Sequence, residues 1–189
     1  MDTEGKIAIA KEKKDVGDQA FKNGEVVNAL RSYHEALMYL NGITKNVQSA
    51  MARENEGDVV DKSAEEKPKT EADEILEKIY SNMAACHIKN GNWRRALETA
   101  DKALAKNPKN SKALFRKAKA LGEQGYFEKA EAILTELTKE DSADGPIILA
   151  ELTRLRAADK VREKEQNKKF KGFLNRDKGA KSAGEKSNS

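Results

Sequence analysis

The chain has 189 residues, of which 36% are charged and 5% aromatic, and its formal net charge is +4. This length fits one domain with an appendage, and the basic excess by itself suggests a nucleic-acid partner. No run of about 18 uncharged apolar residues occurs, which excludes a membrane-spanning helix. One cysteine excludes an internal disulfide and a cysteine-based metal cage. We expect a soluble, cytoplasmic, helix-rich protein.

The first predicted element is a helical hairpin, in the segment GDQAFKNGEVVNALRSYHEAL that begins at Gly17. Gly24 lies at its turn, where a left-handed backbone commonly ends a helix. Ala29 and Ala36 are small residues at which the two helices can approach closely, and Tyr33 is a bulky partner between them. The pattern therefore predicts two antiparallel helices joined at Gly24.

An insertion of 33 residues follows this hairpin, at about residues 41–74. Its middle, residues 54–70, is acidic, polar and contains a proline, so we expect a mobile loop there. Its ends are expected to lengthen the neighbouring helices, because Ile75, Ile79 and Tyr80 already have helical spacing.

Two later segments repeat the pattern of the first hairpin: MAACHIKNGNWRRALETADKAL and KAKALGEQGYFEKAEAILTEL. Their turn glycines, Gly91 and Gly125, are 34 residues apart, and Gly91 lies 67 residues after Gly24. Thirty-four residues is the period of the tetratricopeptide repeat (TPR), a pair of antiparallel helices. Between the second and third pairs, Ser111 is the predicted N-cap of the next helix.

The predicted fold class is all-α, with three helical hairpins stacked as a TPR superhelix over residues 6–142. A charged extension helix is predicted over residues 143–176. Near its start, Ile148, Leu152 and Leu155 form an i, i+4, i+7 stripe that can cap the last repeat.

The end of the chain has a different composition from the repeats. Residues 177–189 are poor in hydrophobic side chains and are expected to be disordered. From Thr153 to Ser189 there are twelve Lys and Arg but five Asp and Glu, so this part carries +7 and residues 1–152 carry −3. Nucleic-acid binding needs a basic folded face with stacking aromatic groups. We therefore expect no nucleic-acid partner.

The layout resembles the three-repeat TPR domain of co-chaperones, especially the C-terminal half of large immunophilins. In that family a long insertion separates repeats one and two, and a seventh helix ends in a sequence similar to KKFKGFLNR of this chain. The run YHEAL, followed by Asn41 and Gly42, is also similar to proteins of the small vertebrate tetratricopeptide repeat protein 9 type. The residues do not decide between these two relatives. The resemblance covers about residues 6–176.

The resemblance implies a carboxylate clamp that binds the acidic C-terminal tail of heat-shock protein 90 or heat-shock protein 70, which ends Glu-Glu-Val-Asp. The positions that match the family motif are Lys14, Asn82, Lys112 and Arg116, and Asp18 stands where the family has Asn. Two cations one helical turn apart and an amide suit a carboxylate ligand. The Asp18 carboxylate brings a like charge near that ligand, so we expect measurable but modest affinity.

Two other binding functions stay open. One is a TPR adaptor for a non-chaperone partner, in which Asp18 has weakened the clamp. The other is a calmodulin-type target in the basic tail, where Lys169 precedes Phe170, Phe173 and Leu174 at i, i+3, i+4 spacing. The client protein of such an adaptor is not defined by the sequence.

No catalytic site, cofactor or metal is predicted. Cys86 and His87 are neighbours on a predicted helix and point about 100° apart, so they cannot form a nucleophile–base pair. Cys86 is expected to be a small buried packing residue. His34 lies in another helix, and two histidines without clustered carboxylates make a poor metal set. No glycine-rich phosphate loop occurs. We predict a protein that is not an enzyme.

Overall fold

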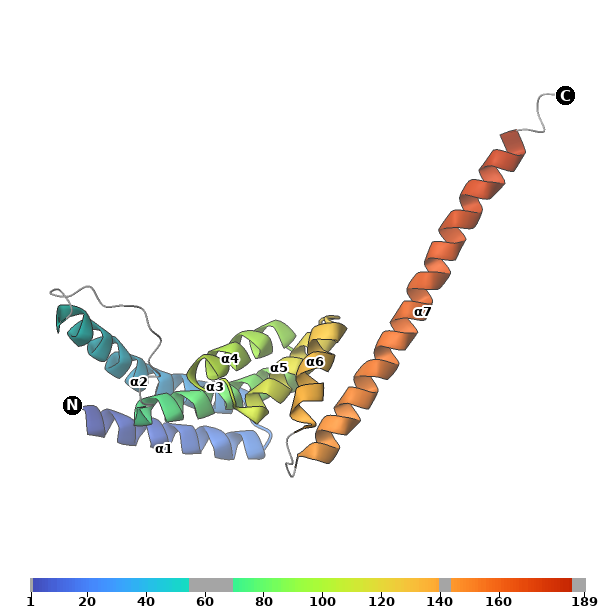
Figure 1. The fold of residues 1–189 in the computed structure, drawn as a ribbon. Helices are drawn as coiled ribbons and strands as arrows, with labels where there is room; N and C mark the ends of the chain where they lie inside the picture. Colours follow the sequence, from blue (N-terminus) through green and yellow to red (C-terminus); the bar gives the residue numbers. More distant parts are fainter. Residues whose placement is uncertain (1, 55–69, 140–143, 185–189) are drawn as a thin grey trace. The chain divides into compact units, whose positions relative to one another are not determined.

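The computed structural model describes residues 2–54, 70–139 and 144–184, and it describes no side chains for residues 42, 44–54 and 172–184. All regular structure in these ranges is α-helical, which confirms the predicted all-α class. The helices in chain order are α1 (Thr3–Lys22), α2 (Val26–Glu54), α3 (Glu71–Lys89), α4 (Trp93–Lys106), α5 (Ser111–Glu123), α6 (Phe127–Leu137) and α7 (Gly145–Gly184) (Figure 1).

The chain forms two compact units, Met1–Tyr126 and Phe127–Ser189. In the first unit, α1 packs on α2 and α3 packs on α4, which gives two helical hairpins. The second helix of one hairpin also contacts the first helix of the next element, as α2 does α3 and α4 does α5. In the second unit, α6 packs on α7.

Glycine ends the first helix of each predicted repeat. Gly24, Gly91 and Gly125 have φ of +86°, +68° and +85°, the left-handed region that favours glycine, and no other described residue has a positive φ. In each turn the residue after the glycine donates its N–H to a carbonyl five residues earlier: Glu25 to Ala20, Asn92 to His87, and Tyr126 to Leu121, all at 2.9 Å. The three predicted turns therefore share one helix-ending hydrogen-bond pattern.

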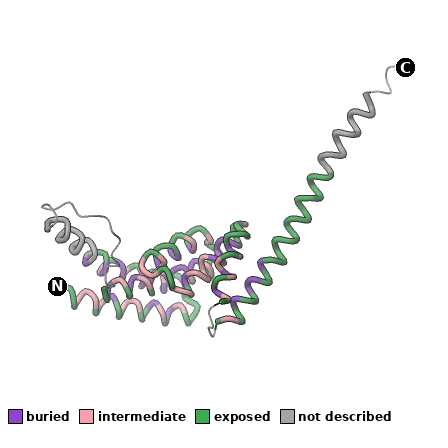
Figure 2. Tube along the Cα trace, viewed as in Figure 1, coloured by how far each residue is buried: buried purple, intermediate pink, exposed green. Residues whose placement is uncertain are grey.

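Alanines fill the positions at which paired helices come closest. Ala29 and Ala36 of α2 and Ala96 and Ala103 of α4 are completely buried, as the repeat pattern requires. Tyr33 lies between the two alanines of α2 and is 1% exposed, which makes it one of the largest fully buried side chains of the first unit. Figure 2 shows the buried positions along the inner sides of the helices.

The insertion lengthens both of its flanking helices, as expected. α2 continues to Glu54, and α3 already begins at Glu71. Thr70 caps α3: its hydroxyl accepts a hydrogen bond from the Asp73 N–H at 3.2 Å, and the Asp73 carboxylate accepts from the backbone of Thr70. This reciprocal capping box fixes the start of α3. The expected mobile loop at residues 54–70 lies almost wholly in residues 55–69, which are outside the described residues.

The predicted N-cap of α5 is wrong by one residue. Ser111 is the first helical residue, and the cap is Asn110, whose side-chain oxygen accepts from the Ala113 N–H at 2.8 Å. Asn and Ser are equally good N-caps, so adjacent candidates cannot be ranked from the sequence. Asn110 is held in place by a second hydrogen bond, from its Nδ2 to Glu77 of α3 at 2.6 Å.

The C-terminal helix is longer than expected. Ile148, Leu152 and Leu155 are buried, as their spacing predicts, and residues 156–171 are exposed (Figure 2). The helix does not end near residue 176 but continues to Gly184, so most of the segment expected to be disordered is helical. Once a helix is nucleated, each further residue adds a backbone hydrogen bond without needing a core. Composition alone therefore misplaced the helix end.

Candidate peptide-binding site

The first helices of the repeats carry the five residues proposed for the clamp. Lys14 and Asp18 are on α1, Asn82 is on α3, and Lys112 and Arg116 are on α5. α3 contacts both α1 and α5, so it connects the two groups of charged residues. All five therefore belong to one unit of the structure, whose three first helices lie in series.

Asp18 is the centre of a hydrogen-bonded cluster. Its Oδ1 accepts from the Tyr33 hydroxyl at 2.6 Å and from Asn82 Nδ2 at 2.8 Å. Its Oδ2 accepts from Lys14 Nζ at 2.8 Å, and Lys14 also donates to Asp15 Oδ1 at 2.9 Å. The carboxylate thus joins side chains from α1, α2 and α3.

The cluster stabilises the charged forms of its acid and base. Burial would raise the pKa of Asp18, but hydrogen bonds from Lys14, Tyr33 and Asn82 hold that pKa below its usual value. Burial would lower the pKa of Lys14, but its bonds to the two carboxylates raise it. Burial and the bond to Asp18 raise the pKa of Tyr33. At neutral pH the cluster is an ion pair with a neutral phenol donating to it.

Gly17 is the residue that allows Tyr33 to reach Asp18. A Cβ atom at Gly17 would lie 2.6 Å from Cε1 and 2.8 Å from Cδ1 of the Tyr33 ring. Such distances are far inside van der Waals contact, and the ring is too deeply buried to move away. The absence of a side chain at Gly17 therefore leaves the space that the aromatic ring of Tyr33 occupies.

Arg116 is a half-buried cation without a carboxylate partner among the residues that the structure describes. Its guanidinium donates to the Ser81 hydroxyl on α3, next to Asn82. Burial lowers the pKa of Arg116, and only Tyr33 and Cys86 oppose this electrostatically. A guanidinium stays protonated at any physiological pH, so its charge cannot be removed by titration. The desolvation of such a charge is unfavourable unless an anion lies beside it.

Lys112 lies one helical turn before Arg116 on α5 and is exposed. Residues at i and i+4 share a helix face, so the two cations can act on one ligand. Together they make the α5 end of the site basic, in contrast to the α1 end around Asp18.

The sequence and the structure agree on part of this arrangement. Direct hydrogen bonds join Asp18 to Lys14 and to Asn82. Arg116 is hydrogen-bonded to Ser81 of α3, the residue next to Asn82. Lys112 shares α5 with Arg116. Sequence reasoning missed two contributors, Tyr33 and Ser81. The size of its side chain predicts only a packing role for Tyr33. The signal in the sequence is Asp18 itself: Lys14 is its basic neighbour on the same helix, and a partly buried carboxylate needs further hydrogen-bond donors.

The basic tail segment is described only in part. Lys169 and Phe170 lie on an exposed stretch of α7, and Phe170 is 67% exposed. The side chains of Phe173 and Leu174 are outside the described residues, so the calmodulin-type motif stays a prediction. Cys86 is completely buried, as expected, and burial raises the pKa of its thiol to about 11.

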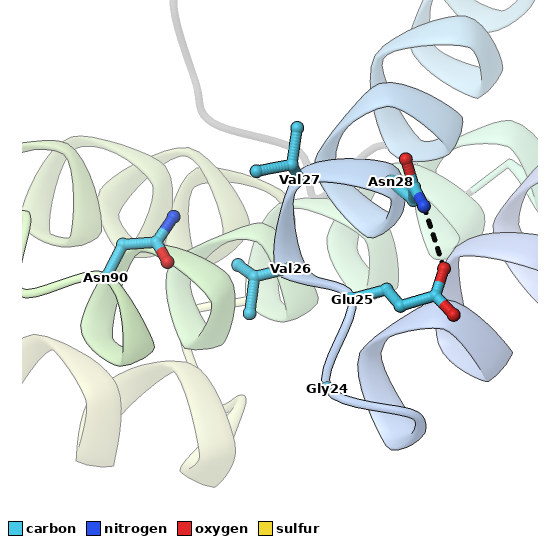
Figure 3. A pocket seen from close by; sticks show the side chains of 6 residues that line it. All are labelled: Gly24, Glu25, Val26, Val27, Asn28 and Asn90. Atoms are coloured by element: carbon cyan, nitrogen blue, oxygen red, sulfur yellow. Dashed lines mark hydrogen bonds between the residues drawn. The ribbon is translucent and has the colours of Figure 1, made fainter.

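A surface hollow at the α1–α2 turn is separate from this site. It is lined by residues at this turn, Gly24, Glu25, Val26, Val27 and Asn28, and by Asn90 at the end of α3 (Figure 3). Its one carboxylate, on Glu25, accepts a hydrogen bond from Asn28 at 2.7 Å. The residues that line the hollow include none of the five clamp positions.

Comparison with known proteins agrees with the repeat geometry. Residues 87–155 match the sequence model of the tetratricopeptide repeat family. The match covers the end of α3, the turn at Gly91, α4, α5, α6 and the start of α7. With the three left-handed glycine turns and the hairpin packing, this defines the class of the structure, which is an all-α fold of the TPR type.

Curated relatives share the repeats but are much longer proteins. The Hsp70/Hsp90 co-chaperone CNS1 of Saccharomyces cerevisiae is 41% identical over 61 residues, which is 32% of this chain and 16% of that protein. Human zinc finger CCCH domain-containing protein 7A is 44% identical over 57 residues, which is 30% of this chain and 6% of that protein. The matches thus cover only a small part of either relative.

Solved structures are similar over most of the chain. The co-chaperone Cns1 of Saccharomyces cerevisiae aligns with a TM-score of 0.61 at 22% identity, over 90% of this chain and 46% of that one. The C-terminal TPR-containing domain of a Plasmodium falciparum FK506-binding protein gives 0.57 at 22% identity, over 83% and 97%. The first TPR of Spaghetti (RPAP3), solved with the HSP90 peptide SRMEEVD, gives 0.55 at 16% identity, over 80% and 93%. At these identities the likeness establishes the fold.

No helix in the described ranges combines the length and the apolar character needed to cross a membrane. In the same ranges, no three His, Cys, Asp or Glu side chains are grouped as metal ligands would be.

Proposed function

We propose that this chain is a non-catalytic TPR adaptor of the co-chaperone type, which binds the acidic C-terminal peptide of heat-shock protein 90 or heat-shock protein 70. Lys112 and Arg116 form the anion-binding pair, and Lys14, Asp18 and Asn82 line the other end of the site. The large-immunophilin type and the tetratricopeptide repeat protein 9 type are both open as relatives, and a cytoplasmic location is part of the proposal.

The observation that carries the proposal is the unpaired charge of Arg116. Its guanidinium is half-buried, and it has one neutral partner, Ser81, among the described residues. The desolvation of a cation is costly unless an anion compensates it, so an anion bound beside Arg116 would be stabilised. A carboxylate can receive two parallel hydrogen bonds from the guanidinium fork. An acidic peptide supplies that carboxylate and several more.

The similar proteins support a chaperone tail as the source of the peptide. CNS1 is an Hsp70/Hsp90 co-chaperone, and the RPAP3 domain with this fold was solved with the peptide SRMEEVD. That peptide has two glutamates and a C-terminal aspartate. It is therefore an acidic ligand of the chemistry that Arg116 and Lys112 need.

Calorimetric titration of the peptide SRMEEVD tests the proposal. We expect a dissociation constant in the micromolar range, weakened by about tenfold or more in Arg116→Ala, the effect of losing one charge-assisted hydrogen bond. Arg94→Ala is the matched control, because Arg94 is an arginine on α4 whose side chain is 87% exposed and pairs with Glu98 at the surface. Equal heats for the wild type and Arg116→Ala would contradict the proposal.

A second candidate is a TPR adaptor for a non-chaperone partner, and the position of Asp18 favours it. The Asp18 carboxylate already binds Lys14 and Asn82, so fewer donors are available to a chaperone tail. A pull-down with full-length heat-shock protein 90 and with a form lacking its last four residues separates the two candidates. Capture of neither form would support the second.

A further inference from the structure

The two ends of the site differ in charge. At the α1 end, Lys14 lies between Asp18 and Asp15, with its Nζ 2.8 and 2.9 Å from their carboxylates, so the three side chains together carry −1. At the α5 end, Lys112 and Arg116 carry +2, and neither has a carboxylate partner within the described part of the chain. A ligand with several carboxylates is therefore attracted at one end only.

Asp18 occupies the donors that a ligand carboxylate would use at the α1 end. A cation from α1, a hydroxyl from α2 and an amide from α3 converge on its two oxygens. A convergent set of this kind is what recognises a free carboxylate. Asp18 is ionised at neutral pH, so the anion for these donors is already present in the protein.

We propose that Asp18 takes the place of a ligand's terminal carboxylate, so that the site binds acidic peptides by their side-chain carboxylates at Lys112 and Arg116 and does not select for a free C-terminus. This inference rests on the proposed function, because it defines which feature of the acidic peptide is read. A terminal carboxylate that approached Lys14 would meet a cluster of net charge −1 and be repelled. Acidic segments within a chain are then as good ligands as acidic C-termini.

Two forms of one peptide test this inference. SRMEEVD with a free carboxylate and the same peptide with a C-terminal amide are titrated into the wild type, Asp18→Asn and Asp15→Asn. Asp15→Asn is the matched control: it removes the same charge from the other partner of Lys14, at a side chain that is 73% exposed.

We expect amidation to change the affinity of the wild type and of Asp15→Asn by less than about twofold. In Asp18→Asn, the donors of Lys14 and Asn82 are released from the internal carboxylate. The free acid should then bind about tenfold or more tightly than the amide, as one regained charge-assisted hydrogen bond predicts.

Each other result overturns one defined statement. A wild type that loses tenfold or more on amidation reads the terminal carboxylate, which overturns the inference. Equal affinity of both peptides for Asp18→Asn also overturns it, because Asp18 is then not what suppresses that reading. If no protein binds either peptide, the proposed function fails, and a measurement without peptide decides the role of Asp18.

That measurement is an acetate titration followed by the side-chain amide resonances of Asn82 in nitrogen–proton correlation spectra. Acetate presents only a carboxylate and needs no peptide sequence. A response in Asp18→Asn and none in the wild type supports the internal occupation of these donors. A response in both proteins, or in neither, overturns it.

Discussion

The α1 end and the α5 end of the candidate site differ in how the charge of a partly buried cation is compensated. Both hold a partly buried cation, Lys14 in one case and Arg116 in the other. Lys14 is neutralised within the protein by Asp18, whereas the one hydrogen bond of Arg116 to a described side chain goes to the neutral Ser81. A charge compensated within the fold contributes to stability, and a charge left uncompensated is available for a ligand. The difference separates a structural end of the site from a binding end.

The largest expected effect comes from a substitution at Gly17, against which the Tyr33 ring packs. Gly17→Ala places a methyl group within 2.6 Å of the buried ring, so we expect the free energy of unfolding to fall by about 1–3 kcal/mol, the usual cost of overpacking. Urea unfolding measures it. Gly145→Ala is the matched control, because a Cβ there meets no atom within 4 Å. Equal stabilities of the two variants would show that Tyr33 is not fixed by Gly17.

A smaller change removes only the hydroxyl that Tyr33 donates to Asp18. Tyr33→Phe keeps the ring and should lower the free energy of unfolding by about 0.5–1.5 kcal/mol, the net value of one hydrogen bond. The pKa of Asp18 should rise, because one of the bonds that hold it down is lost. Carboxyl chemical shifts followed during an acid titration measure this pKa. An unchanged pKa would place Tyr33 outside the compensated cluster.

At the other end, removal of the uncompensated charge should cost no stability. Arg116→Met keeps most of the side-chain volume and removes a desolvated cation, so we expect the free energy of unfolding to be unchanged or to rise by up to about 1 kcal/mol. Binding of SRMEEVD should be lost in the same variant. A clear loss of stability in thermal and urea unfolding would mean that Arg116 is compensated within the protein after all.

His87 offers a third case, a buried group that can discard its charge. Burial first, and then the nearby Arg95 and His34, lower its pKa in the folded protein. Since the unfolded chain, with a histidine pKa of about 6.5, binds the proton more readily, stability should decrease as the pH falls below about 6.5. Urea unfolding between pH 7.5 and 5 measures this slope.

His87→Leu should flatten the slope, and His34→Gln, at an exposed position, should keep it. The contrast with Arg116 is direct, because an arginine cannot become neutral and must find an anion. A wild type with no loss of stability over this pH range would contradict the assignment of His87 as a buried neutral group.

The regular features of the fold could be predicted from single residue types. Gly24, Gly91 and Gly125 mark the turns because only glycine adopts their backbone without strain, and Ala29 and Ala36 mark a close approach of helices. Features at helix ends could not be predicted as well. Adjacent capping residues compete at the start of α5, and the end of an exposed helix such as α7 is not marked by any packing requirement.

The candidate site could be predicted as a set of residues but not as a network. Spacing indicated that Lys112 and Arg116 share a face, and that Asp18 conflicts with an acidic ligand. The partner of Asp18 from α2, the hydroxyl of Tyr33, lies 15 residues away and carries no sequence signal for this role. Only the geometry of two packed helices brings it within 2.6 Å.

By itself, the sequence determined the repeat period, the places of the turns and the positions of the cations, because these depend on local backbone conformation and on residue type. The tertiary structure alone decided which cations are already neutralised. The net charge of +4 says nothing about this. Pairing depends on distances across helices, where Asn82 reaches Asp18 over 64 residues and Arg116 reaches Ser81 over 35. The strength of these interactions is set by burial, which exists only once the helices have packed.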